Sequence, residues 1–141
     1  MIKPAQSFIH PYNNYEVITG QATCAKRIDQ KRSLRLDFII APVGGGGLLS
    51  GTLLSVSLLL PSTIVYAGEP EGAADAILSI KNGKIEKAPF CKNDCRWFCL
   101  LHLAIKLFRS LSNTVKDILT VSDEEIIAAM RLVYERNEDC G

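Results

Sequence analysis

The sequence contains no apolar run long enough to cross a membrane, and its N-terminus has no signal-peptide pattern. The longest apolar run, Leu53 to Leu60, is interrupted by two serines and ends at Pro61, far short of the roughly 20 residues that a spanning helix needs. Residues Met1 to Gln6 lack the apolar core of a secretory signal. We therefore expect a cytoplasmic protein that makes no contact with a membrane.

Net charge is almost absent as well. Lysines and arginines number 16 against 15 aspartates and glutamates, which leaves a net charge of +1. This balance gives no electrostatic reason to expect a nucleic-acid partner or a membrane surface. A hydrophobic content of 48% and a charged content of 22% over 141 residues are typical of one globular domain with one core.

Cysteine occurs in an odd number and in an unusual pattern. The cysteines are Cys24, Cys91, Cys95, Cys99 and Cys140. An odd count in a cytoplasmic chain argues against a disulfide framework. Three of them follow a C-x3-C-x3-C spacing with His102 beyond, which differs from the usual zinc and iron–sulfur spacings. On a helix the three thiols would share one face, so a zinc-binding protein stays open as one alternative.

Glycine, by contrast, is concentrated at one place. An apolar, β-branched run ends at Val43, four consecutive glycines follow at Gly44 to Gly47, and an apolar helix-like run begins at Leu48. Bare backbone lets N–H groups converge on one anion, and a helix start adds free donors and a positive dipole end. We expect the loop to bind a phosphate group; a flexible turn between buried elements is the alternative. The spacing is neither the G-x-G-x-x-G fingerprint nor a P-loop.

Hydrophobic periodicity and turn residues predict alternating strands and helices. The expected strands are a short strand end at Ser7–His10, then Leu36–Val43, Thr63–Ala67 and Asp117–Val121. The expected helices are Tyr15–Gln30, Leu48–Leu60, Ala73–Lys81 and a last helix that Ser122 and Glu125 begin as a capping box. This order predicts an α/β fold with a largely parallel sheet. Ligands of such sheets bind at the carboxyl ends of the strands, where the glycines lie.

Finer expectations concern burial and helix ends. The strand at Leu36–Val43 is apolar throughout, so we expect both of its faces to be buried. Asn82 and Gly83 predict the stop of the third helix. The first helix is expected to turn these side chains inward: Val17, Ile18, Thr23, Cys24 and Ile28.

An acidic turn follows the strand at Thr63–Ala67. Glu69, Glu71 and Asp75 cluster there. Acidic residues are favoured in the first turn of a helix by its dipole, which by itself explains Glu71 and Asp75.

Pro42 to Gly51 resembles the phosphate-binding loop of fold-type II pyridoxal-phosphate (PLP) enzymes, which are tryptophan synthase beta-like. The closest branch is the threonine/serine dehydratase and serine racemase family. Three other segments agree with this family in order and spacing: Phe8 to Gln21, Gly68 to Asp75 and Val121 to Ile126. Family members are much longer and have two domains. The resemblance implies their three-layer parallel-sheet cofactor domain in incomplete form, because residues 1–141 match only the second half of that large domain.

The resemblance also implies a cofactor and a reaction. PLP serves as an electron sink for the α-carbanion of a hydroxy amino acid substrate. Loss of the β-hydroxyl gives a 2-oxo acid and ammonia, whereas reprotonation gives racemisation, as in serine racemase. The phosphate would be held by Gly44, Gly45, Gly46, Gly47 and the N–H of Leu48. The parent enzyme is expected to be a homo-oligomer.

Two parts of the family's site lie outside this sequence. The Schiff-base lysine lies upstream of the matching segment, and a late serine lies beyond Gly141. We therefore predict that this chain alone is catalytically inactive. A stand-alone phosphate- or PLP-binding module without catalysis is the alternative.

In the racemase branch the acidic turn holds a divalent cation. Carried over, the ligands would be Glu69, the backbone carbonyl of Ala73, and Asp75, which are oxygen donors that suit Mg²⁺ or Ca²⁺. The helix near Gly20 departs from the family: Ala22 stands where the family has glycine, and Arg27 replaces a glutamate.

The resemblance is lost between about residues 93 and 114. Back-translated, Asn93 to Trp97 can read Thr-Ile-Ala-Asp-Gly one base later, which is the family sequence, and the frame returns by Val115. Asn137 to Gly141 can likewise read Met-Lys-Ile-Val-Val. We therefore hypothesise that residues 91–114 are a frame-shifted, non-native segment of a decayed or mis-sequenced gene, which predicts poor solubility of the isolated chain.

Overall fold

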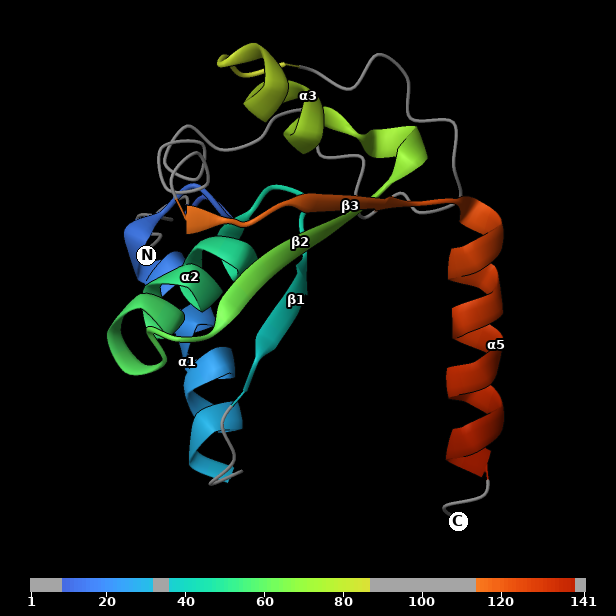
Figure 1. Ribbon diagram of the computed structural model, residues 1–141, viewed down its shortest axis with the longest axis horizontal. Coiled ribbons are helices and arrows are strands. Elements are labelled where there is room, and N and C mark those ends of the chain that lie inside the picture. The colour runs from blue at the N-terminus through green and yellow to red at the C-terminus, as the bar shows by residue number, and fades with distance from the viewer. Residues whose placement is uncertain (1–8, 32–35, 87–113, 139–141) are drawn as a thin grey trace, which may run out of the picture.

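Three parallel strands form the centre of the fold. The computed structural model describes residues 9–31, 36–86 and 114–138. Within these ranges β1 (Phe38–Pro42), β2 (Ile64–Pro70) and β3 (Ile118–Val121) form one sheet in the order β1-β2-β3 (Figure 1). The helices are α1 (Tyr15–Lys31), α2 (Gly47–Leu59), α3 (Asp75–Asn82) and α5 (Asp123–Glu138), with a short 3-10 turn at Glu71–Ala73. The predicted α/β fold with a parallel sheet is confirmed.

Part of the predicted pattern lies outside the described residues. It comprises Ser7 and Phe8 of the expected strand end, Cys91, Cys95, Cys99, Cys140 and His102 of the zinc alternative, and the segment 91–113 of the frame hypothesis. Ile9 and His10 are described, and they do not belong to a strand.

β2 is longer than the expected strand at Thr63–Ala67. Its last four residues pair with β3, from Ala67 opposite Ile118 to Pro70 opposite Val121. This second ladder carries the strand through Glu69, so the acidic turn begins inside the sheet rather than after it.

The core lies between α2 and one face of the sheet. Its buried residues are Ala41, Val43, Leu49, Leu53, Val56, Val65, Ala67, Ala76 and Ile118. The crossover from β1 through α2 to β2 places α2 on this face, and α1 packs against α2 on the same side (Figure 1).

α1 and α2 approach each other closely because small residues line their contact. A Cβ atom added at Gly51 would lie 2.5 Å from the backbone nitrogen of Ala22 and 2.6 Å from the carbonyl oxygen of Ile18. One turn further along α2, the Ser55 hydroxyl donates a hydrogen bond of 2.5 Å to the carbonyl oxygen of Ala22. Glycine at position 51 is therefore required by the helix crossing.

The inward face predicted for α1 is largely wrong. Thr23, Cys24 and Ile28 are exposed, whereas the buried positions are Ile18, Ala22 and Ala25. Ile18 is thus buried as predicted, and the close crossing at Gly51 brings the small side chain of Ala22 to the contact instead of Thr23 or Cys24.

The prediction that β1 is buried on both faces is also wrong for this chain. Ala41 is buried on the side of α2, but Phe38 and Ile40 are 58% and 55% exposed on the other side. The described chain covers only one face of the sheet with packed helices.

Two helix-end predictions are confirmed by backbone geometry. Gly83 ends α3 in the left-handed region with φ of 66°, and its N–H donates to the carbonyl of Ile80. At the start of α5 the Ser122 N–H donates to the Glu125 carboxylate at 2.9 Å, and the Glu125 N–H donates to the Ser122 hydroxyl at 3.3 Å. This reciprocal pair is the expected capping box.

Candidate cofactor site

The glycine loop joins the carboxyl end of β1 to the first turn of α2. Gly46 lies immediately before α2 with φ of 93° and ψ of 4°, a left-handed conformation that only glycine adopts readily. The first helical hydrogen bond runs from the Ser50 N–H to the Gly46 carbonyl at 2.9 Å. The N–H groups of Gly47, Leu48 and Leu49 precede this bond and have no acceptor within the helix.

No side chain of the helix itself satisfies these donors. Gly46 has no side chain to cap the helix, and the first turn of α2 contains no acidic residue. The positive end of the helix dipole is therefore not neutralised from within α2, and the loop presents donors to a negatively charged group.

Tyr12 explains why the loop needs glycine at more than the left-handed position. A Cβ atom at Gly45 would lie 2.5 Å from the ring atom Cδ1 of Tyr12, and one at Gly47 would lie 3.3 Å from the Cα of Tyr12. The backbone of the loop thus runs directly against a tyrosine from a distant part of the chain.

His10 fixes the turn that carries Tyr12. The imidazole and the Tyr12 ring pack edge to face, with ring centroids 4.5 Å apart. The Nδ1 atom of His10 accepts a hydrogen bond from the Asn13 N–H at 3.0 Å. Tyr12 and His10 lie in a segment that resembles the family, yet no pattern in the sequence signals that they lie beside the glycines.

Within the part of the chain that the structure describes, two buried side-chain oxygens near the loop have no hydrogen-bond partner. They are Oδ1 of Asn13, next to Tyr12, and Oγ of Ser50, one turn after Gly46. Ser50 is 6% exposed. Buried polar atoms are normally paired, so these two oxygens are unusual for a folded interior.

The acidic turn lies at the carboxyl end of the neighbouring strand. The Val43 N–H, at the start of the loop, donates to the carbonyl of Gly68 at 2.8 Å, and Glu69 follows directly. The parallel register, with Pro42 opposite Gly68, thus brings the two predicted sites to the same edge of the sheet.

Glu69 is bound by the start of α3. Glu69 is 1% exposed, and its carboxylate accepts hydrogen bonds from the N–H groups of Ala76, at 3.1 Å, and Ile77, at 2.8 Å. Burial raises the pKa of Glu69 to about 7, and nearby Asp75 adds to the rise, while the two N–H donors oppose it. A carboxyl group with this pKa titrates near neutrality.

The other two predicted metal ligands lie close along the chain. Ala73 and Asp75 are buried, at 2% and 3% exposure, whereas Glu71 is exposed. Among the described residues no group of three or more His, Cys, Asp or Glu side chains has the arrangement of a metal site. The predicted set contains two carboxylates and one backbone carbonyl.

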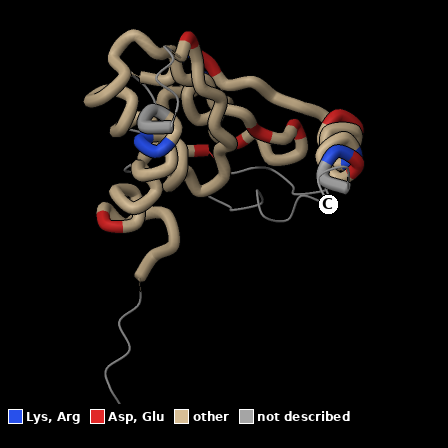
Figure 2. The backbone as a smooth tube through the Cα atoms, turned by 90° about the horizontal axis from the view of Figure 1, so that it is seen from below, with Lys and Arg blue, Asp and Glu red and all other residues tan. Residues whose placement is uncertain are grey.

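Acidic positions outnumber basic ones along the described backbone. Figure 2 shows the acidic positions spread over the fold, and α5 carries both kinds. In the ranges that the structure describes, no helix is long and apolar enough to span a membrane.

A strand, a glycine loop and a helix start at the carboxyl edge of a parallel sheet define an anion-binding unit of an α/β protein. Residues 3–138 match the family described as pyridoxal-phosphate dependent enzyme. The chain belongs to this family of PLP-dependent enzymes, and its predicted membership of the fold-type II class is confirmed.

Relatives within the family include dehydratases and racemases. The chain is 44% identical over 130 residues to the beta-hydroxyaspartate dehydratase of Paracoccus denitrificans, covering 91% of this chain and 40% of that protein. It is 39% identical over 129 residues to the serine racemase of Dictyostelium discoideum, covering 91% of this chain and 40% of the relative. The chain thus spans about 40% of the length of the curated relatives it matches.

Solved structures of such enzymes share the fold. The threonine deaminase of T.th. matches with a TM-score of 0.86 and 35% identity, over 92% of this chain and 48% of that one. Maize serine racemase matches with a TM-score of 0.85 and 33% identity, over 90% of this chain and 38% of that one.

Proposed function

We propose that the loop from Gly44 to Leu48 holds the phosphate of PLP. The observation that carries this proposal is the set of backbone N–H groups at Gly47, Leu48 and Leu49, which lack helical acceptors and receive no capping hydrogen bond from the N-cap residue Gly46. Phosphate accepts several such bonds and is favoured by the helix dipole. The close approach of Tyr12 adds support, because it leaves no room for side chains at Gly45 and Gly47, so the loop presents only backbone groups.

The enzyme to which this part belongs is proposed to dehydrate a hydroxy amino acid. The relative at 44% identity is named a beta-hydroxyaspartate dehydratase, and another at 36% is named an L-threo-3-hydroxyaspartate ammonia-lyase. Serine racemases are a second candidate, because several relatives carry that name at 34% to 39% identity. In either case the bound cofactor supplies an electron sink for the substrate's α-carbon.

In this reaction the chain's own residues would bind and orient the cofactor. The loop's N–H groups fix the phosphate end of the cofactor, and the ring of Tyr12 holds the loop in place from the side of Gly45. The lysine that would link to the cofactor belongs to the family segment upstream of this sequence. We therefore propose that the chain by itself does not turn over substrate.

The acidic turn is proposed to hold Mg²⁺ or Ca²⁺ through Glu69, the Ala73 carbonyl and Asp75. Support comes from the burial of all three residues, which lie between the end of β2 and the start of α3, and from the oxygen chemistry of the set. The raised pKa of Glu69 adds support, since a nearby cation would stabilise the charged carboxylate that burial disfavours.

A binding titration with matched glycine variants tests the phosphate proposal. PLP binding is measured by equilibrium dialysis, with pyridoxal and inorganic phosphate as further probes. Gly46→Ala forces alanine into the left-handed region inside the loop, where the strain is about 1–2 kcal/mol. This strain is expected to weaken PLP binding by roughly tenfold. Gly83→Ala is the control, because Gly83 also has a positive φ but ends α3 away from the loop.

The expected result is that inorganic phosphate competes with PLP, that pyridoxal binds much more weakly, and that only Gly46→Ala reduces binding. Equal binding of pyridoxal and PLP would show attachment to surface lysines instead. Equal binding by the two glycine variants would likewise contradict a role for the loop.

A further inference from the structure

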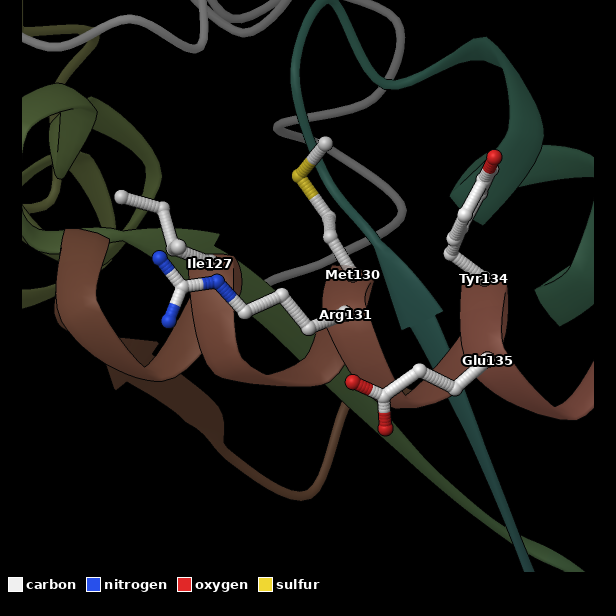
Figure 3. Close-up of a pocket in the computed structure, with 5 residues that line it drawn as sticks. All are labelled: Ile127, Met130, Arg131, Tyr134 and Glu135. Atoms are coloured by element: carbon white, nitrogen blue, oxygen red, sulfur yellow. The ribbon is translucent and has the colours of Figure 1, made fainter.

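A shallow hollow on α5 is formed by that helix alone. Met130 and Tyr134 point to the same side of the helix, and the residues that line the hollow are Ile127, Met130, Arg131, Tyr134 and Glu135 (Figure 3). Among the described residues no other element contributes to this lining, so no groups from different segments converge there on a ligand. Segments far apart in the sequence meet instead at the glycine loop, where the turn before α1 lies against it.

The turn before α1 is organised by the side chain of His10. Its Nδ1 atom accepts a hydrogen bond from the Asn13 N–H at 3.0 Å, and the Tyr12 N–H makes a longer contact with it at 3.5 Å. An Nδ1 atom that accepts carries no proton, so the proton of the neutral ring lies on Nε2. Asparagine and aspartate side chains at the start of a turn accept from backbone N–H groups further along the chain in the same way. His10 thus has the role that an asparagine commonly has in such turns.

The cap of α1 does not depend on His10. The Oδ1 atom of Asn14 accepts from the Glu16 N–H at 2.7 Å, so a different side chain caps this helix. Pro11 has no N–H of its own and therefore does not compete for the His10 nitrogen. A change at His10 is thus expected to affect the turn while leaving the start of α1 capped.

The glycine loop is anchored at its two ends, and Tyr12 lies against it between them. At one end the Val43 N–H donates to a carbonyl of β2 at 2.8 Å, and at the other the Ser50 N–H donates to the Gly46 carbonyl at 2.9 Å. The Tyr12 ring lies against Gly45, because a Cβ atom there would come within 2.5 Å of the ring atom Cδ1. The position of the ring therefore affects the course of the backbone that leads into α2.

The ring of Tyr12 is in turn held by His10. The two rings pack edge to face with centroids 4.5 Å apart, and the Nδ1 atom fixes the backbone from which the Tyr12 side chain extends. Loss of the hydrogen bond is the costlier of the two changes, because it leaves the partly buried N–H of Asn13 without its acceptor.

We propose that His10 is a positioning residue of the glycine loop. By accepting the N–H of Asn13, its Nδ1 atom keeps the Tyr12 ring on Gly45 and the loop in the shape that receives an anion. That this anion is the phosphate of PLP rests on the proposed function, whereas the support of the loop by His10 does not.

Three variants of the full chain separate the acceptor of His10 from its ring. His10→Asn keeps an acceptor for the same N–H groups but removes the ring, whereas His10→Phe keeps a ring but removes the acceptor. Ile9→Asn is the control, because it introduces the same side chain at the preceding residue, which is 59% exposed.

The position of the loop and its binding of PLP are measured separately. The NMR signals of Gly45 report where the Tyr12 ring lies, because an aromatic ring shifts the signals of protons that it contacts. Tyr12→Leu supplies the reference signals of a loop without this ring. PLP binding is measured by equilibrium dialysis with inorganic phosphate as competitor.

His10→Asn and Ile9→Asn are expected to keep the wild-type signals of Gly45 and to bind PLP within about twofold of the wild type. His10→Phe is expected to move these signals towards those of Tyr12→Leu. It is also expected to weaken PLP binding about tenfold, as the loss of one hydrogen bond implies.

Wild-type signals in His10→Phe, or an equal change in His10→Asn, would overturn the proposal. Loss of helix in the far-UV circular dichroism of His10→Phe would also overturn it, because the acceptor would then serve the whole fold rather than the loop. Unchanged, phosphate-competed PLP binding in His10→Phe would do the same. If the signals of Gly45 change as expected while phosphate fails to compete with PLP in the wild type, the inference holds and the proposed function alone is refuted.

Discussion

Replacing Gly51 by alanine is expected to destabilise the fold, although alanine is the better helix former. The added Cβ would lie 2.5, 2.6 and 2.7 Å from backbone atoms of Ala22, Ile18 and Gln21. Carbon contacts settle at about 3.5–4.0 Å, so α1 and α2 must move apart by roughly 1 Å. Because the obstructing atoms are backbone, no side-chain rotation relieves the clash.

The magnitude follows from three contributions. Overpacking of this kind costs about 1–3 kcal/mol, and stretching the hydrogen bond from Ser55 to the Ala22 carbonyl adds roughly 0.5–1.5 kcal/mol. Replacing glycine by alanine in a helix raises the free energy of unfolding by about 1 kcal/mol, which offsets part of this loss. The net change for Gly51→Ala is a loss of about 2 kcal/mol in the free energy of unfolding.

Gly20→Ala is the matched control, and urea denaturation followed by circular dichroism is the assay. Gly20 lies in α1, and a Cβ added there meets nothing within 4 Å. This variant is therefore expected to gain up to about 1 kcal/mol from helix propensity alone. If Gly51→Ala were as stable as Gly20→Ala, the close crossing of α1 and α2 would be refuted.

Two further predictions concern the acidic turn. The pKa of Glu69 is raised from 4.5 to about 7 in the fold, so between these pH values the native state binds more protons than the unfolded state. The free energy of unfolding should therefore fall by about 3 kcal/mol as the pH rises from 4.5 to about 7. Glu69→Gln should remove this pH dependence. An unchanged pH dependence in the variant would refute the raised pKa of Glu69. Mg²⁺ or Ca²⁺ is expected to raise the melting temperature at alkaline pH in the wild type and in Glu71→Gln, but not in Asp75→Asn. Equal shifts in all three proteins would contradict the metal proposal.

The sequence predicted the helix ends that depend on interactions between residues close together in the chain. The capping box of Ser122 and Glu125 and the stop at Gly83 are confirmed. Both could be predicted because their hydrogen bonds join residues only three apart in the sequence. α2 begins within one residue of the expected Leu48, because the glycines of the turn directly precede the helix in the sequence.

Contacts between distant segments were not predictable in the same way. Tyr12 and Gly45 meet only in three dimensions, and no periodicity in either segment signals the contact. Thr23, Cys24 and Ile28 were wrongly expected on the inner face of α1, because the crossing at Gly51 that brings Ala22 inward joins segments far apart in the sequence. The hydrogen bonds of Glu69 to the start of α3 were not predicted either, because they depend on the extension of β2, which pairing with β3 produces.

The most direct test of the phosphate site is a backbone amide NMR titration with inorganic phosphate. The proposed function predicts saturable shifts that are largest at the N–H groups of Gly47, Leu48 and Leu49. Shifts concentrated instead at Ala76 and Ile77, where Glu69 already occupies the start of α3, would contradict it, as would the absence of any saturable change in the loop.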